Sequence, residues 1–162
     1  MIPELWLRCA YRPALSLLPA RMDSEVAAVV ILAICLQESE LQHRRQMGYT
    51  SAQPGGARGY VQLERIGSDE VLRHPASQAA ARVVCLTLDY EHEDLDDVWL
   101  ALEHNDVLAA AWARLALWRH PSPLPSDQDE AWENYLAIWR PGHPRPERWP
   151  ASYGRAVEAV LG

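Results

Sequence analysis

The longest apolar stretch of the chain, Val26 to Leu36, has no polar face. A helix that is apolar all round lies at the centre of a domain, and Asp23 or Ser24 can cap its first turn. The β-branched residues of the stretch would also suit a buried strand, but its length, alanine content and polar flanks favour a helix. The pattern therefore predicts a buried central helix that ends where the sequence becomes polar, at Gln37-Glu38-Ser39-Glu40.

Further helices are predicted on both sides of this segment. Before it, Pro13 can open a short helix that Pro19 closes. After it, spacing and capping residues predict helices over Pro75 to Tyr90 (with Val83, Val84, Leu86 and Leu88 inward), Leu95 to His104, Val107 to Trp118 capped by Asp106, Ala131 to Trp139 started by Asp127 or Asp129, and a last helix ending near Leu161. We expect an all-α fold in which about five to seven helices surround the central one, with at most a small irregular β element near residues 59–63.

Composition and charge narrow the class of protein. The 162 residues are 49% hydrophobic and 23% charged, which fits one globular domain over residues 1–162 rather than a disordered chain. A net charge of −7 argues against nucleic acid as a partner, because binding phosphate requires clustered Lys and Arg.

The cysteines and the apolar runs indicate where the protein is made. Cys35 and Cys85 lie inside apolar runs and are expected to be small buried hydrophobes, and the odd count of three argues against a disulfide framework. This indicates a reducing compartment. The start of the chain shows no signal-peptide pattern, and Val26 to Leu36 is too short to span a bilayer. We therefore expect synthesis in a reducing compartment, with no membrane span.

Glu38 is the main candidate for chemistry. On a helix it shares a face with Ile31 and Ile34, so desolvation and the negative end of the helix dipole should both raise its pKa. A carboxyl group that keeps its proton near neutral pH can act as a general acid. The plainer interpretation is that Glu38 is only the first solvated residue after a core helix.

A glycine-rich segment follows, Gly55-Gly56-Ala57-Arg58-Gly59-Tyr60-Val61-Gln62-Leu63-Glu64. Glycine permits positive φ and close approach of the backbone to a ligand, although an ordinary tight turn would also use it. Glu38-Ser39 followed by Gly56-Ala57-Arg58-Gly59-Tyr60-Val61-Gln62-Leu63 resembles the lytic-transglycosylase and goose-type-lysozyme superfamily, and in particular the small lysozyme-like proteins of tailed phages. The resemblance covers roughly residues 23–120.

The resemblance implies a lysozyme-like fold and cleavage of the β-1,4 bond between N-acetylmuramic acid and N-acetylglucosamine in peptidoglycan. Glu38 would be the catalytic acid, Ser39 would orient it or the substrate, Gly59 would let the backbone run close to the sugar, and Gln62 would lie near the cleft wall. Tyr60 could stack on a sugar face. No cofactor is implied. The Ala-rich segment Ala109 to Leu115 lacks the Tyr-Asn pair that the family usually carries on such a helix.

Several other residues have two possible roles, one in this chemistry and one in the surface or the core. Glu64 is the best candidate for a second catalytic carboxylate, and the alternative is a surface ion pair with Arg65 or Arg58. Arg44 and Arg45 could contact substrate carboxylates or simply end a solvated loop. The helical spacing of the tryptophans predicts core positions for Trp112, Trp118, Trp132 and Trp139. Histidines and carboxylates show no metal-ligand spacing, so no metal is expected.

Two functions remain open. The first is a peptidoglycan-cleaving enzyme that acts on glycan strands at the cell wall or is carried in a phage virion, with virion proteins as further candidate partners. The second is a lysozyme-like virion module with weak or no activity, which the acidic charge and the missing Tyr-Asn pair favour. An open groove beside a desolvated Glu38 would support the enzyme, whereas a groove filled by the chain's own tryptophans would support the module.

Overall fold

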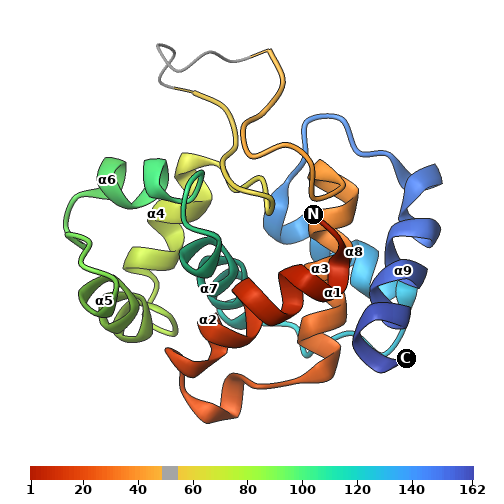
Figure 1. Cartoon of the computed structure of the whole chain (residues 1–162), viewed down its shortest axis with the longest axis horizontal. Helices are drawn as coiled ribbons and strands as arrows, with labels where there is room; N and C mark the ends of the chain where they lie inside the picture. The colour runs from red at the N-terminus through yellow and green to blue at the C-terminus, as the bar shows by residue number, and fades with distance from the viewer. Residues whose placement is uncertain (49–54) are drawn as a thin grey trace.

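The computed structural model describes residues 1–48 and 55–162, and its helices gather around α3, Glu25–Ser39 (Figure 1). Every side chain from Ala27 to Leu36 is buried, as expected of a helix without a polar face. The helix begins where the Ser24 hydroxyl accepts a hydrogen bond from the Ala27 N–H at 3.3 Å. The prediction of an all-α fold around a buried central helix is confirmed.

The other helices surround α3 on all sides. In Figure 1, α4 to α6 lie on one side of the molecule, α8 and α9 lie on the other, and α7 passes between them. The long partner of α3 is α9, which runs alongside it. In chain order the remaining elements are α1 (Pro3–Trp6), a π-helical turn η1 (Leu7–Tyr11), α2 (Arg12–Ser16), a 3₁₀ turn η2 (Ala20–Met22), α4 (Arg65–Arg73), α5 (Gln78–Thr87), α6 (Leu95–Ala101), α7 (Asp106–Trp118), α8 (Gln128–Trp139), a 3₁₀ turn η3 (Pro146–Arg148) and α9 (Trp149–Leu161).

The expected β element is small. Two isolated antiparallel bridges join Arg58 to Arg45 and to Leu63, and residues between them form a turn. No strand forms among residues 1–48 and 55–162. The part of the chain that the structure describes also contains no helix long and apolar enough to cross a membrane.

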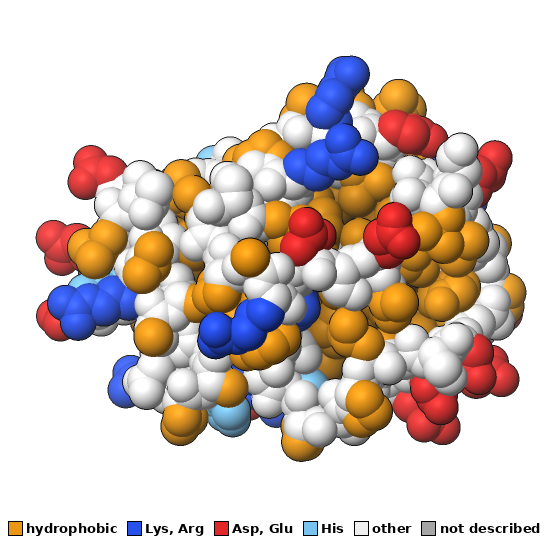
Figure 2. Space-filling model, turned by 90° about the horizontal axis from the view of Figure 1, so that it is seen from below, with side chains coloured by type: hydrophobic (Ala, Val, Ile, Leu, Met, Phe, Trp, Pro, Cys, Tyr) orange, Lys and Arg blue, Asp and Glu red, His pale blue; other side chains and the backbone are white. Residues whose placement is uncertain are grey.

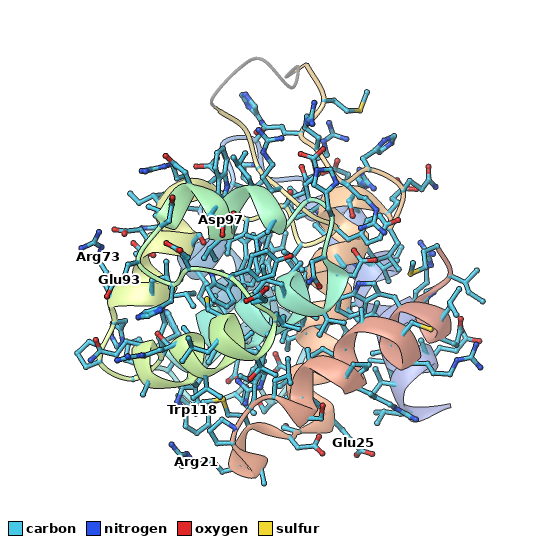
Figure 3. The ribbon with its side chains drawn as sticks, turned by 60° about the vertical axis from the view of Figure 1, so that its left-hand side comes forward. Arg21, Glu25, Arg73, Glu93, Asp97 and Trp118 are labelled. Atoms are coloured by element: carbon cyan, nitrogen blue, oxygen red, sulfur yellow. The ribbon has the colours of Figure 1, made fainter. Side chains whose placement is uncertain are left out.

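The core is one cluster of apolar side chains that extends from Trp6 to Ala156. Cys35, Cys85 and Trp112 are fully buried and Trp139 is nearly so, which confirms their predicted core positions. Trp118 and Trp132 are only partly buried and pack against the edge of this cluster. The Trp118 ring is covered from outside by the Arg21 guanidinium, 5.6 Å from its centroid (Figure 3).

The N-terminal helix begins ten residues earlier than Pro13 predicts, at Pro3. Inside an α-helix, the proline ring would clash with the carbonyl oxygen four residues before it. The turn immediately before α2 is a π-helix, which widens the backbone at this point and lets Pro13 follow without ending the helix. The helix therefore runs from Pro3 to Ser16, and Pro13 lies within it.

Two differences from the predicted helices lie between residues 65 and 90. The hydrophobic pattern did not predict α4, because the buried face of this helix consists of Gly67, Ser68 and Val71 and carries little hydrophobic signal. The next helix, α5, begins at Gln78 rather than Pro75, and its inward residues are Ala81, Val84 and Cys85. Val83 and Leu86 were predicted inward, but they are 53% and 61% exposed.

The remaining helices differ from prediction only at their ends. Asp94 caps α6, which ends at Ala101 rather than His104. Asn105, not Asp106, caps α7 by accepting from the Leu108 N–H. Asp127 caps α8, which therefore begins three residues earlier than expected.

Candidate functional site

A cleft of about 650 Å³ opens at the C-terminal end of α3. One wall consists of the last turn of α3 and the glycine-rich segment, and the other consists of α8 and the chain that follows it to Arg148. Four of the six predicted site residues line this cleft: Glu38, Ser39, Gln62 and Glu64. The two motifs that the sequence placed about twenty residues apart therefore meet at one site.

Glu38 lies in the last turn of α3 and is partly buried. Its Oε1 accepts a hydrogen bond from the Tyr135 hydroxyl at 2.6 Å. Burial raises the pKa of Glu38 above its usual range, and the nearby charge of Glu64 acts in the same direction. The Tyr135 hydrogen bond and the charges of Arg145 and Arg148 lower this pKa but do not cancel the effect of burial.

Tyr135 is the functional candidate that the sequence analysis missed. It lies on α8, at helical spacing from Trp132 and Trp139, and its ring is buried. The available signal was its hydroxyl, because a buried tyrosine oxygen requires a polar partner. That partner, Glu38, is 97 residues away in sequence, so spacing alone could not identify it.

Ser39 is buried beneath the floor of the cleft. Its Oγ lies 2.7 Å from the Tyr60 carbonyl oxygen and 2.9 Å from the Cys35 carbonyl oxygen, and it accepts from the Leu41 N–H at 3.2 Å. These contacts join the end of α3 to the glycine-rich turn. Ser39 is thus placed to orient the backbone that carries Glu38 rather than to reach far into the cleft.

The backbone beside Glu38 is held in an unusual conformation. Glu40 and Leu41 have φ values of 51° and 55°, and Gln62 in the glycine-rich segment has a φ of 47°. A left-handed conformation in residues other than glycine costs of order 1–3 kcal/mol each and is found most often at functional sites. The strain at this cleft is therefore consistent with a site where geometry matters.

Gly59 and Tyr60 belong to the turn next to the cleft but are not among the residues that line it. Gly59 has a φ of 71°, and a Cβ at this position would lie 2.5 Å from the Leu102 carbonyl oxygen, so no larger residue fits. The Tyr60 ring is buried under the Arg44 guanidinium, whose Cζ lies 4.3 Å from the ring centroid. Arg44 does not line the cleft either. The Gln62 side-chain amide donates to the Gly59 carbonyl oxygen at 2.8 Å and fixes the turn.

Glu64 ends the glycine-rich segment directly before α4, lines the cleft and is exposed. The two arginines suggested as its partners bind elsewhere: Arg65 binds Asp96, and Arg58 binds Glu103. Among the described residues, Glu64 takes part in no ion pair. Its carboxylate is therefore free to face the cleft that Glu38 also lines.

Beside the cleft, a network of ion pairs anchors the long segment after α3. Glu103 accepts from Arg45 at 2.6 and 3.1 Å and also from the buried Arg58. Burial alone would raise the pKa of Glu103, but the hydrogen bonds from Arg45 and Arg58 outweigh it and leave this pKa below its usual range. Arg44 pairs with Asp106 at the start of α7.

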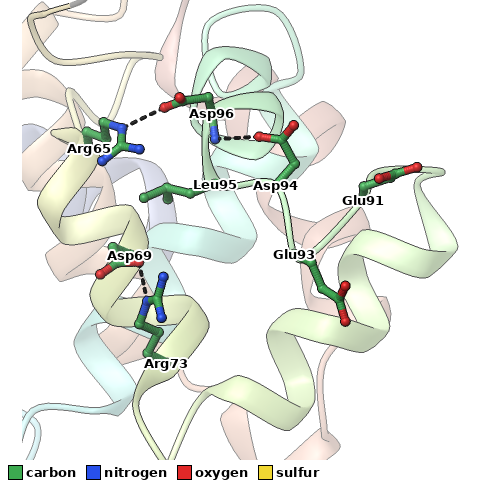
Figure 4. A pocket seen from close by; sticks show the side chains of 8 residues that line it. All are labelled: Arg65, Asp69, Arg73, Glu91, Glu93, Asp94, Leu95 and Asp96. Carbon is green, nitrogen blue, oxygen red and sulfur yellow. Dashed lines mark hydrogen bonds and ion pairs between the residues drawn. The ribbon is translucent and has the colours of Figure 1, made fainter.

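Two other hollows offer less chemistry. One, of about 710 Å³, lies between α2, the start of α3 and the end of α9, where hydrophobic side chains gather on the underside of the molecule (Figure 2). The other, of about 550 Å³, is lined almost entirely by charged residues, and its arginines are already paired, Arg65 with Asp96 and Arg73 with Asp69 (Figure 4).

Metal binding finds no support in residues 1–48 and 55–162, where no group of three or more His, Cys, Asp and Glu side chains could hold an ion. Comparison of the chain with protein-family models, curated proteins and solved structures finds no match. The function must therefore be argued from the cleft itself.

Proposed function

We propose that the protein cleaves the β-1,4 bond between N-acetylmuramic acid and N-acetylglucosamine in peptidoglycan, with Glu38 as the general acid. One observation carries this proposal: in an open cleft, the Glu38 carboxyl group is hydrogen-bonded to Tyr135 and partly withdrawn from water, which raises its pKa. The resemblance of the Glu38-Ser39 and Gly56 to Leu63 motifs to lytic transglycosylases and goose-type lysozymes points to the same substrate.

The two carboxyl oxygens of Glu38 can have different roles. Oε1 is occupied by the Tyr135 hydroxyl, so Oε2 is the oxygen that carries the proton. In the first step this proton passes to the glycosidic oxygen as the bond to the sugar breaks. The carboxylate that remains is stabilised by the Tyr135 hydroxyl and by the positive charges of Arg145 and Arg148.

In the second step Glu38 recovers its proton as a general base. It takes the proton either from the substrate's own 6-hydroxyl, which yields a 1,6-anhydro sugar, or from water, which yields a reducing end. The water route usually uses a second carboxylate, and Glu64, which lines the same cleft, is the candidate for that role. Lytic transglycosylases need no second carboxylate, so the role of Glu64 distinguishes the two routes.

The charge around the cleft suits an acidic glycan better than the net charge of −7 suggests. Glu38, Glu40 and Glu64 line the cleft, but so do three arginines and two histidines: Arg45, Arg145, Arg148, His43 and His143. The arginine side chains alone match the carboxylates in number. The acidic balance of the chain therefore does not block this particular cleft.

The alternative, a lysozyme-like module without activity, predicts a groove filled by the chain's own tryptophans. Of the tryptophans in the described chain, only Trp139 is among the residues that line the cleft, and its indole N–H is held by the Val61 carbonyl oxygen at 2.7 Å. The space beside Glu38 is open. This geometry favours the enzyme over the module.

The setting that the resemblance suggests is a bacteriophage or prophage. The protein would be made in the bacterial cytoplasm and would act on the wall during lysis or from within a virion, where virion proteins would be further partners. The chemistry at Glu38 would be the same in either setting.

The test is mass spectrometry of purified peptidoglycan after incubation with the wild type and with Glu38→Gln. Soluble muropeptides from the wild type alone are expected. Products with 1,6-anhydro ends identify a transglycosylase, and Glu64→Gln should then remain active. Products with reducing ends identify a hydrolase, and Glu64→Gln should then be impaired. No products from the folded wild type with several wall types would contradict the proposal.

A further inference from the structure

Behind Tyr135, four aromatic rings pack together between α8 and α9. The Tyr135 and Trp149 rings are stacked, with centroids 5.5 Å apart and planes at 10°. Trp132 contacts the Tyr135 ring at 5.1 Å and Trp149 at 5.4 Å, and Tyr153 packs against the outer side of Trp149. The ring that reaches Glu38 thus packs against two tryptophans that also contact each other.

Both the side chain of Trp149 and the helix that it begins are held by hydrogen bonds. It is 2% exposed, and its indole N–H donates to the Gln128 carbonyl oxygen at the start of α8 at 2.9 Å. It begins α9, whose first turns are bonded to α3 because the Ser152 hydroxyl donates to Gln37 at 3.1 Å. The Gln37 amide in turn donates to the Arg145 carbonyl oxygen at 2.9 Å. The position of the Trp149 ring is therefore tied to the helix that carries Glu38.

A stacked ring restricts its neighbour in a specific way. A tyrosine hydroxyl lies at the end of two rotatable bonds, so a small tilt of the ring moves the oxygen by a large part of a hydrogen-bond length. Stacking opposes such a tilt, and tryptophan offers a wide flat surface for it. The hydroxyl of the stacked Tyr135 ring is the one that donates to Glu38 at 2.6 Å.

We propose that Trp149 is a positioning residue for the cleft, which holds the Tyr135 hydroxyl against Glu38 by stacking on the Tyr135 ring. The catalytic consequence rests on the proposed function, but the effect on Glu38 does not. The two can therefore be measured separately, one by glycan cleavage and the other by titration of the Glu38 carboxyl group.

The experiment uses the full chain labelled with ¹³C at the glutamate carboxyl groups, and the Glu38 signal is assigned by its loss in Glu38→Gln. Trp149→Leu removes the stacked ring, and Trp149→Phe keeps a ring to stack. Trp112→Leu is the matched control, because Trp112 is also fully buried and also donates its indole N–H at 2.9 Å, but to Ser68 and outside this cluster. Circular dichroism checks that each variant folds.

The pKa of Glu38 should rise in each variant that weakens the hydrogen bond from Tyr135. Tyr135→Phe removes a donor to the ionised carboxylate and should raise the pKa of Glu38 by about 0.5 to 1 unit. Trp149→Leu should shift this pKa in the same direction, while Trp149→Phe and Trp112→Leu leave it near the wild-type value. Glu64, Arg145 and Arg148, the other charged groups that act on Glu38, are unchanged in all of these variants.

A double variant separates positioning from general loosening. In the Tyr135→Phe background, Trp149→Leu should produce no further rise, because the hydroxyl it positions is gone. A fall in the pKa in Trp149→Leu, as water enters, would overturn the inference, and so would a rise that persists without the Tyr135 hydroxyl. If Trp149→Leu does not fold, Trp132→Leu replaces it, since Trp132 is only partly buried, and should give a smaller rise. The absence of any rise in that variant would also overturn the inference.

Cleavage is measured on the same proteins. Trp149→Leu should lose about 10-fold or more in kcat, as expected when a catalytic group is displaced, with KM little changed. If no variant, including the wild type, cleaves glycan but the titration depends on Trp149 as described, the proposed function fails and the positioning role stands. If the wild type cleaves glycan and the titration ignores Trp149, the positioning role fails and the function stands.

Discussion

Glu38 and Glu103 are both removed from much of the solvent, yet their surroundings drive their pKa values in opposite directions. Glu103 receives two guanidinium groups, Arg45 and Arg58, and its pKa is lowered. Glu38 receives one neutral hydroxyl from Tyr135, and its pKa is raised. The two sites border the same long segment after α3, so the difference is due to the donors and not to the region of the fold.

The comparison shows that burial alone does not identify a catalytic acid. Desolvation raises the pKa of both carboxyl groups, but a charged donor reverses the effect and a neutral donor only reduces it. Glu103 is therefore an anion at neutral pH that pairs with Arg45 and Arg58. Glu38 is a group that can exchange its proton in an open cleft.

The largest expected effect on stability is at Glu103. Glu103→Gln leaves the Arg58 guanidinium, which is 2% exposed, without its counter-charge. Removing one partner of a buried pair costs about 3–5 kcal/mol, so chemical denaturation should show a loss of that order. Glu93→Gln is the matched control, because the Glu93 side chain is 90% exposed and its replacement should change the stability by less than about 0.5 kcal/mol. A similar small change in both variants would show that the ion pairs contribute little.

The pH dependence of stability should differ in sign between the two glutamates. Because the folded pKa of Glu103 is lowered, its contribution is present above the ordinary value of 4.5 and is lost as the pH falls through the folded pKa. Because the folded pKa of Glu38 is raised, its contribution is present below 4.5 and is lost as the pH rises through the folded pKa.

Denaturation across a pH series checks these signs. Glu38→Gln should be more stable than the wild type at neutral pH, and the difference should shrink in acid. The deficit of Glu103→Gln should be greatest at neutral pH and should also shrink in acid. A Glu38→Gln variant that is less stable than the wild type at neutral pH would contradict the contrast between the two sites.

Tyr135→Phe tests whether the neutral donor tunes Glu38. The variant loses a hydrogen bond to the ionised form, so the pKa of Glu38 should rise and the alkaline limb of the pH–rate profile should move to higher pH. Cleavage at the optimum should fall by about 10-fold, in line with the loss of one hydrogen bond to a charged group. A limb that moves to lower pH would mean that water entering the site outweighs the hydrogen bond.

The shift of the alkaline limb should be smallest in Glu64→Gln, and it should have the opposite sign. The charge of Glu64 raises the pKa of Glu38, so its removal should move the alkaline limb slightly to lower pH. Glu40→Gln serves as the comparison, because Glu40 also lines the cleft but is paired with Arg148. An equal or larger shift in Glu40→Gln would show that Glu64 has no special place in the site.

Much of the fold could be predicted from the sequence, because several elements carry strong local signals. The central helix has apolar residues on every face, and Ser24 and Asp127 cap helices where the polar pattern indicated. The prediction failed where the decisive contact is not local. A buried face of small residues at α4 and a π-helical turn before Pro13 depend on packing against distant helices, which a hydrophobic pattern does not record.

The candidate site was predicted in part for the same reason. Glu38 follows directly from the polarity change at the end of α3, and Gln62 and Glu64 follow from the glycine-rich motif. Tyr135 could not be found in this way, because its role depends on a contact between α3 and α8. Tyr60 was expected to stack on a sugar face. That role stays a prediction, and the Tyr60 ring is buried under Arg44 in this structure.

The most direct test of the account is the rate of glycan cleavage from acid to alkaline pH in the wild type and in Glu38→Gln. The wild-type rate should fall on the alkaline side at a pH above the ordinary pKa of glutamate, 4.5, and Glu38→Gln should lose about 10²- to 10⁴-fold in rate at every pH. Cleavage by Glu38→Gln at the wild-type rate, or no cleavage by the folded wild type at any pH, would contradict it.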